Sequence, residues 1–182
     1  MSPSRVALGA LVVAVLLPVA ANAAPITRQY TFTGSNVQTT IGSAPPPFSS
    51  VTLTFQVTFD PLVQQINAPS GATLIGSNLP LGSAFQHSFV PSNMDRMSVG
   101  GAANGTFGIA VINNDFTLDF RNAQSSAPTF DLFQFATSAT PGSAFRAFTG
   151  QITSTAVSEP AGMTLLMAAG ALALGAARRR RA

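Results

Sequence analysis

The chain lacks several residue types on which common protein chemistries depend. Its 182 residues include no cysteine, no lysine and no tryptophan, and only one histidine and one tyrosine. Without cysteine there is no disulfide, no thiolate zinc site, no cysteine nucleophile and no lipid-modified N-terminal cysteine. Only 8% of the residues are charged, whereas an ordinary soluble domain has about a quarter. The length suits one domain, and the excess of apolar residues lies at the two ends of the chain.

Basic residues are also concentrated at the ends, which argues against a nucleic-acid partner. The formal net charge is +3, but it comes from Arg5 and from a terminal block of arginines. The residues between them carry four arginines against six acidic residues. The interior of the chain therefore has no basic face that could follow a phosphate backbone.

The N-terminal segment has the three parts of a secretory signal peptide. Arg5 supplies a positive charge, and an apolar run follows over residues 6–20. The sequence Ala21-Asn22-Ala23 then gives the small-x-small pattern of a cleavage site. We predict that residues 1–23 are a signal peptide and that the mature chain starts at Ala24.

The C-terminal segment has the character of a membrane span followed by a positive stop. Residues 161–177 contain no charged side chain. As a helix they would span about 25 Å, slightly less than a hydrocarbon core of about 30 Å. The block that follows consists of Arg178, Arg179, Arg180 and Arg181. Adjacent arginines resist translocation and stay in the cytoplasm, as does Arg5, so the interior is expected outside the inner membrane.

A short motif, Val157-Ser158-Glu159-Pro160, stands directly before this apolar segment. A Glu-Pro motif, an apolar helix rich in small residues and a terminal arginine cluster, in that order, resemble the PEP-CTERM sorting signal. The resemblance covers residues 157–182, together with the general style of the signal peptide. The family motif usually reads Pro-Glu-Pro, so Glu159 and Pro160 match it and Ser158 departs from it.

The resemblance implies a route for the protein after export by the secretion machinery. It implies that an exosortase, a membrane-embedded and cysteine-dependent enzyme, cuts near the motif. The protein would then pass from the inner membrane of a Gram-negative bacterium to the cell surface or to an extracellular matrix that contains exopolysaccharide. Pro160 ends any strand and leaves an extended, accessible backbone for such processing. A permanent single-span anchor is the alternative.

The interior, residues 24–156, is expected to form one all-β domain. Residues 51–59 alternate apolar and polar side chains without a fault, which indicates a strand with one buried face. Further strands are predicted over 30–33, 85–89, 116–120, 130–135 and 145–157. We predict a single antiparallel β-sandwich, jelly-roll-like, with roughly seven to nine strands and with a closed barrel as the alternative.

Two local features of this domain are also predicted. Residues 106–119 are expected to form a hairpin, because Asn113-Asn114-Asp115 supplies turn residues between two alternating runs. The alternation breaks within 130–135, which indicates a β-bulge in that strand.

Few interior side chains could carry chemistry. His87 is the single histidine, and alone it makes neither a zinc site nor a catalytic triad. We therefore expect His87 to be a surface or strand residue. Asp115, Asp119 and Asp131 are weak candidates for oxygen ligands of a calcium ion, although their spacing does not match an EF-hand loop. No cofactor and no catalytic residue are predicted.

Two classes of function follow from these observations. The first is an exported, non-enzymatic protein of the cell surface or matrix, associated with exopolysaccharide. The alternative is a secreted carbohydrate-binding module or hydrolase with the same sorting tail, using His87 and the three aspartates. Sugar stacking is disfavoured because tryptophan is absent and Tyr30 is the single tyrosine. Clustering of the four candidate side chains in one cleft would favour the alternative.

Overall fold

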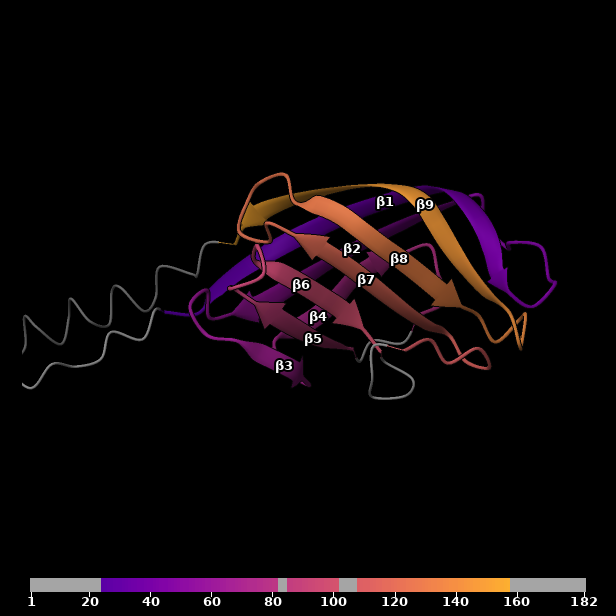
Figure 1. Ribbon diagram of the computed structural model, residues 1–182, viewed down its shortest axis with the longest axis horizontal. Coiled ribbons are helices and arrows are strands. Elements are labelled where there is room, and N and C mark those ends of the chain that lie inside the picture. The colour runs from indigo at the N-terminus through magenta and orange to yellow at the C-terminus, as the bar shows by residue number, and fades with distance from the viewer. Residues whose placement is uncertain (1–23, 82–84, 102–107, 158–182) are drawn as a thin grey trace, which may run out of the picture.

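The described part of the chain consists of strands and connecting loops (Figure 1). The computed structural model describes residues 24–81, 85–101 and 108–157. The strands are β1 (Ile26–Ile41), β2 (Ser50–Phe59), β3 (Gln65–Ala68), β4 (Ala72–Ser77), β5 (Gln86–Val90), β6 (Arg96–Gly100), β7 (Asp115–Arg121), β8 (Thr129–Ala136) and β9 (Ala144–Ala156). The all-β class predicted from the alternating patterns is confirmed.

The two terminal segments singled out in the sequence fall outside this description. Among the described residues there is no helix long and apolar enough to cross a membrane. The predicted signal peptide over 1–23, the apolar segment over 161–177 and the arginine block over 178–181 lie beyond the described ranges, as do residues 158–160 of the motif predicted over 157–160.

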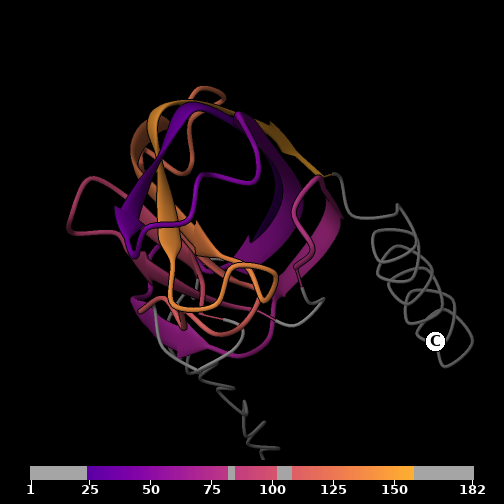
Figure 2. The same cartoon turned by 90° about the vertical axis from the view of Figure 1, so that its right-hand side faces the viewer.

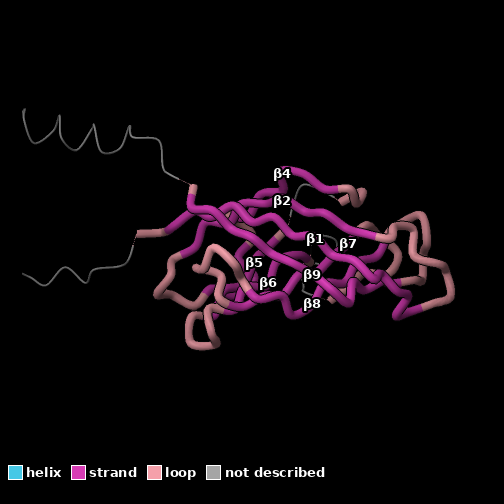
Figure 3. The backbone as a smooth tube through the Cα atoms, turned by 90° about the horizontal axis from the view of Figure 1, so that it is seen from above, coloured by secondary structure: helices cyan, strands magenta, loops and turns pink. Residues whose placement is uncertain are grey.

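All nine described strands belong to one antiparallel sheet. Its order is β3-β5-β6-β7-β8-β9-β1-β2-β4. The sheet curls, so that β5 to β8 lie in front of β1, β2 and β4 in Figure 1. Seen along the long axis, the strands wrap around a common centre (Figure 2). The first and last strands, β1 and β9, are neighbours in the middle of the sheet and run side by side along the molecule (Figure 3).

The two ends of the sheet approach each other at the turn between β3 and β4. These strands follow one another in the chain but occupy opposite ends of the sheet order. In the turn, the carbonyl oxygen of Gly71 accepts a hydrogen bond from the backbone N–H of Thr58 on β2 at 2.6 Å. Next to it, the rings of Phe59 on β2 and Phe89 on β5 lie 4.5 Å apart between centroids. The hydrogen bond extends the pairing of β2 with β4, whereas the ring contact and the short connection between β3 and β4 bring the two ends of the curled sheet together.

The predicted sandwich of two sheets differs from this arrangement. Two layers do face each other across the core, but they are halves of one continuous sheet. The continuity comes from β9, which pairs with β1 along most of its length and with β8 at Phe133↔Ala147, Gln134↔Arg146 and Phe135↔Phe145. Alternation in the sequence reports which side of a strand is buried, but it does not report which strands pair.

A pair of glycines lies where Phe32 packs across β1 and β9. Gly34 on β1 is opposite Gly150 on β9. A Cβ atom on either glycine would lie 2.7 Å from the ring of Phe32, which is closer than packed carbon atoms approach. The ring thus fills the space that two side chains would need, and the glycines allow the aromatic core to extend under both strands.

The core is built mainly from aromatic rings of both halves of the sheet. The largest fully buried side chains include Tyr30, Phe32, Phe55, Phe59, Phe89, Phe116, Phe120, Phe133, Phe135 and Phe145. The ring of Tyr30 stacks on Phe55 at 5.3 Å and lies 5.1 Å from Phe120. Burying each such ring contributes about 1.5–3 kcal/mol, so this cluster is the main stabilising element of the curled sheet.

The strand predictions are confirmed in most places and wrong in one. Strands occur at or around each of the predicted segments. The bulge is also confirmed, because Asp131 is the extra residue between the pairs Asp119↔Leu132 and Phe120↔Phe130. The hairpin over 106–119 is wrong in its described part, since residues 108–114 form turns and loop and β7 pairs with β6 and β8 instead.

Candidate functional site

The four side chains proposed for chemistry lie in three different places. On β7, Phe116, Leu118 and Phe120 are buried in the core, and the intervening positions face outward. Asp119 therefore lies on the outer face of the sheet. The side chain of His87 points to the core, because residues 85, 87 and 89 lie on the same side of the chain and Phe85 and Phe89 are buried. The side chains do not converge on one cleft.

Asp115 holds a loop in place. Its side chain is fully buried. One carboxylate oxygen accepts a hydrogen bond from the backbone N–H of Ala110 at 2.8 Å, and the other accepts from that of Phe116 at 2.9 Å. Residues 108–114 form turns and loop, and these two bonds anchor the loop that leads into β7. The carboxylate thus has a structural task.

His87 is buried at 1% exposure, so the part of the prediction that placed it at the surface is wrong, whereas its place in a strand is confirmed. Its Nε2 atom lies 3.1 Å from Oε1 of Gln65 on β3, and its Nδ1 atom has no hydrogen-bond partner. Burial lowers the pKa of His87 below its ordinary value of 6.5. The ring is therefore neutral at pH 7 and contributes to packing where the sheet ends meet.

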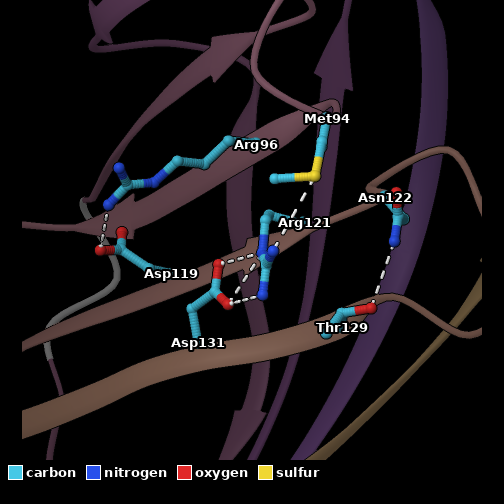
Figure 4. A network of polar contacts seen from close by, with 7 residues as sticks. All are labelled: Met94, Arg96, Asp119, Arg121, Asn122, Thr129 and Asp131. Carbon is cyan, nitrogen blue, oxygen red and sulfur yellow. Dashed lines mark hydrogen bonds and ion pairs between the residues drawn. The ribbon is translucent and has the colours of Figure 1, made fainter.

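Asp119 and Asp131 form ion pairs on the outer face of β6, β7 and β8 (Figure 4). The Asp119 carboxylate accepts from Arg96 at 2.8 Å. The Asp131 carboxylate accepts from Nε and an amino group of Arg121, with distances between 2.7 and 2.9 Å. Hydrogen bonding to this carboxylate raises the pKa of Arg121.

Arg96 and its sequence neighbour Asp95 have different polar partners. Arg96 turns to Asp119, and the Asp95 carboxylate accepts from the amide of Gln124 at 3.1 Å. In the part of the chain that the structure describes, no three histidine or acidic side chains gather as a metal site would require. In particular, the carboxylate of the calcium candidate Asp115 is bonded to the backbone of its own loop and does not lie beside Asp119 and Asp131.

A groove of about 400 Å³ runs over the outer face next to the Arg96–Asp119 pair. Its walls come from β3 and from β5 to β8, and its polar side chains include Ser88, Ser98, Thr117 and Gln134. A groove of this kind can accept hydrogen bonds from a polar ligand and donate to it. It offers no general base beside a nucleophile, because its carboxylate is already paired with a guanidinium group.

A second surface, which the sequence did not single out, covers the outer face of β9, β1 and β2. Over residues 27–35 of β1, 50–58 of β2 and 149–155 of β9, the outward positions are serine, threonine or glutamine. We call these residues the polar face: Thr27, Gln29, Thr31, Thr33 and Ser35 of β1, Ser50, Thr52, Thr54, Gln56 and Thr58 of β2, and Thr149, Gln151, Thr153 and Thr155 of β9. None of them is buried. In the sequence, these residues are the polar members of the segments in which apolar and polar side chains alternate.

Comparisons with known proteins add no relative to this description. No family model, no curated protein and no solved structure matches the chain.

Proposed function

We propose that the protein is an exported, non-enzymatic component of the cell surface or extracellular matrix. In this proposal an exosortase recognises Ser158-Glu159-Pro160, processes the C-terminus and releases the domain into an exopolysaccharide layer. The signal peptide over residues 1–23 directs export, and the apolar segment over 161–177 holds the chain in the inner membrane until processing occurs.

A backbone hydrogen bond at the C-terminal end of the described residues supports this proposal. The N–H of Val157, the first residue of the motif over 157–160, donates to the carbonyl of Thr27 at 2.9 Å, and the matching residues Glu159 and Pro160 follow after Ser158. A cut at the motif would leave every strand of the described sheet intact. It would also leave the aromatic core unchanged, because no core residue lies beyond Ile152 in the described chain.

The non-enzymatic part of the proposal is supported by the separation of the candidate groups. His87 faces the core, Asp115 anchors a loop, and Asp119 and Asp131 are paired with arginines. The groove beside Asp119 favours a second candidate function, a secreted module that binds a polar ligand. A retaining or inverting glycosidase needs a free pair of carboxyl groups about 5–10 Å apart, which is why the hydrolase alternative is less well supported.

The mass of the mature protein tests the proposal. The protein is isolated from its native cells, and its intact mass is combined with peptide mapping of both ends. We expect a start at Ala24, an end near Glu159 and no arginine block. An extracellular form that retains Arg178–Arg181 would contradict the proposal.

Substitutions in the motif sharpen this experiment. The double substitution Glu159→Ala and Pro160→Ala is expected to leave the full tail on the protein in the membrane fraction. The matched variant Ser158→Pro restores the usual family motif, and it is expected to be processed at least as completely as the natural sequence. If the natural protein and both variants were processed equally, the proposal that the motif directs processing would be wrong.

A further inference from the structure

We infer that the polar face on β9, β1 and β2 binds a linear, uncharged polysaccharide chain laid along the strands. This inference rests on the proposed function only in one respect, namely that export brings the protein into contact with such a polymer at the cell surface or in the matrix. The chemistry of the ligand is argued from the face itself.

The rows of the polar face are set by strand register. Thr31 of β1 is opposite Thr153 of β9 and Thr54 of β2, and Thr33 is opposite Gln151 and Thr52 in the same manner. Along β1 the face extends from Thr27 to Ser35, which is about 26 Å at about 3.3 Å per residue, and it is three strands, or about 10 Å, wide. A long, narrow strip of this kind suits a single extended polymer chain better than a compact ligand.

The centre of the face offers free hydroxyl groups. At its ends, neighbouring side chains bond to one another: Thr27 to Thr58 at 2.8 Å and Ser35 to Thr149 at 2.7 Å. Among the described residues, the central hydroxyls of Thr153, Thr31 and Thr54 make no side-chain hydrogen bond. Each can both donate and accept, as a sugar hydroxyl also does.

The absence of charge on the face selects the ligand class. The described arginine–aspartate pairs lie on the outer face of β6, β7 and β8, and none of the residues of the polar face is charged. Arg146 of β9 lies beyond the end of the face, over the ring of Phe148 at 5.1 Å from its centroid. An anionic or cationic polymer would find no opposite charge on the polar face, whereas a neutral one loses no ionic hydration when it binds. Threonine methyl groups add apolar contacts for the C–H faces of sugar rings.

The rigidity of the face favours binding without aromatic stacking. Threonine is stiff about χ1, so its hydroxyl loses little freedom when a ligand binds, in contrast to long charged side chains. The twist of the sheet turns successive rows relative to each other. A flexible polymer can follow this twist, whereas the flat surface of a crystal cannot.

Affinity electrophoresis of the protein tests the inference. The protein is expressed as the full chain, purified in whichever form the cells make, with or without its tail, and run through gels containing dextran, hydroxyethyl cellulose or alginate. We expect retardation by at least one of the two neutral polymers, unchanged by added salt, and none by alginate. Retardation by alginate that disappears with salt would overturn the inference, and so would the absence of retardation in all three gels.

Variants separate the polar face from the groove. The triple substitution Thr31→Val, Thr54→Val and Thr153→Val removes the central hydroxyls and keeps β-branched side chains, so thermal unfolding should change little. We expect it to weaken binding about tenfold or more, since each lost hydrogen bond contributes modestly. The matched control Thr117→Val removes a hydroxyl from the groove and should leave binding unchanged. Loss of binding in the control but not in the triple variant would move the site to the groove.

This test is independent of sorting. A protein that retains its tail but still binds a neutral polymer would contradict the proposed processing and keep the inference. A correctly processed protein that binds none of the polymers would contradict the inference and leave the proposed processing in place.

Discussion

The ring of Phe32 lies against Gly150 on the neighbouring strand, so that a Cβ atom on the glycine would be 2.7 Å from the ring. The same hypothetical atom would lie 2.9 Å from the ring of Phe130. Two rings thus enclose one glycine at the junction of β1, β8 and β9. A single methyl group at this position has no free space.

Gly150→Ala is therefore expected to lower the free energy of unfolding by about 1–3 kcal/mol, since overpacking of a rigid core forces rings from their rotamers. Chemical denaturation of the mature protein measures the change. Gly76→Ala is the matched control, because nothing lies within 4 Å of a Cβ at this edge-strand position, and it should be neutral. A neutral Gly150→Ala would show that the rings can move apart.

Stability should fall as the pH drops below about 6.5 because of His87. Burial lowers its pKa in the folded protein, so the unfolded chain binds the proton more readily. Folding stability then rises with pH across the window from the lowered pKa up to 6.5 and is lost below it. His87→Gln removes this titrating group and keeps a polar partner for Gln65. Thermal unfolding between pH 7 and 5 should show a smaller loss of stability in the variant than in the natural protein.

Tyr30→Phe should be destabilising although it deletes only one oxygen. The buried hydroxyl donates to the carbonyl of Ala123 at 3.0 Å, and its removal leaves that carbonyl without this partner. The expected cost is about 1–3 kcal/mol, measured by denaturant titration. Burial also raises the pKa of Tyr30, so its phenolate absorbance should appear in alkaline solution only when the protein unfolds.

The two kinds of aspartate should respond differently to neutralisation. Asp115→Asn replaces one of two accepting oxygens by an amino group that faces a backbone N–H, and we expect a loss of about 1–3 kcal/mol. Asp131→Asn weakens a partly exposed pair with Arg121, which contributes about 1 kcal/mol or less. Both are measured by denaturant titration, and equal losses would contradict the structural task given to Asp115.

The sequence predicts the individual strands better than their assembly. The run over 51–59 shows its buried face directly, and the broken alternation near Asp131 corresponds to the bulge. Even the orientation of His87 could have been found, since it shares the period of Phe85 and Phe89. The short strands β3 and β6 are different, because four or five residues give too little period to recognise.

The candidate surfaces were beyond the sequence for a related reason. The outward threonines of β1, β2 and β9 are visible as alternating residues, but they come from segments more than a hundred residues apart at the extremes. Only the register of Thr31 with Thr54 and Thr153 makes them one surface. Similarly, the sequence neighbour of Arg96 is Asp95, whereas sheet pairing gives it Asp119.

The pairing of β1 with β9 in the middle of the sheet ties the order of folding to the order of chain delivery. β1 can pair with β2 as soon as both have been made, but its other partner, β9, is the last strand of the described domain. Contacts of such large sequence separation form late and slowly. A chain that crosses a membrane from its N-terminus would thus remain without the β1–β9 pair until nearly all of the domain has emerged, so the curled sheet would be completed on the far side of the membrane and only at the end of export.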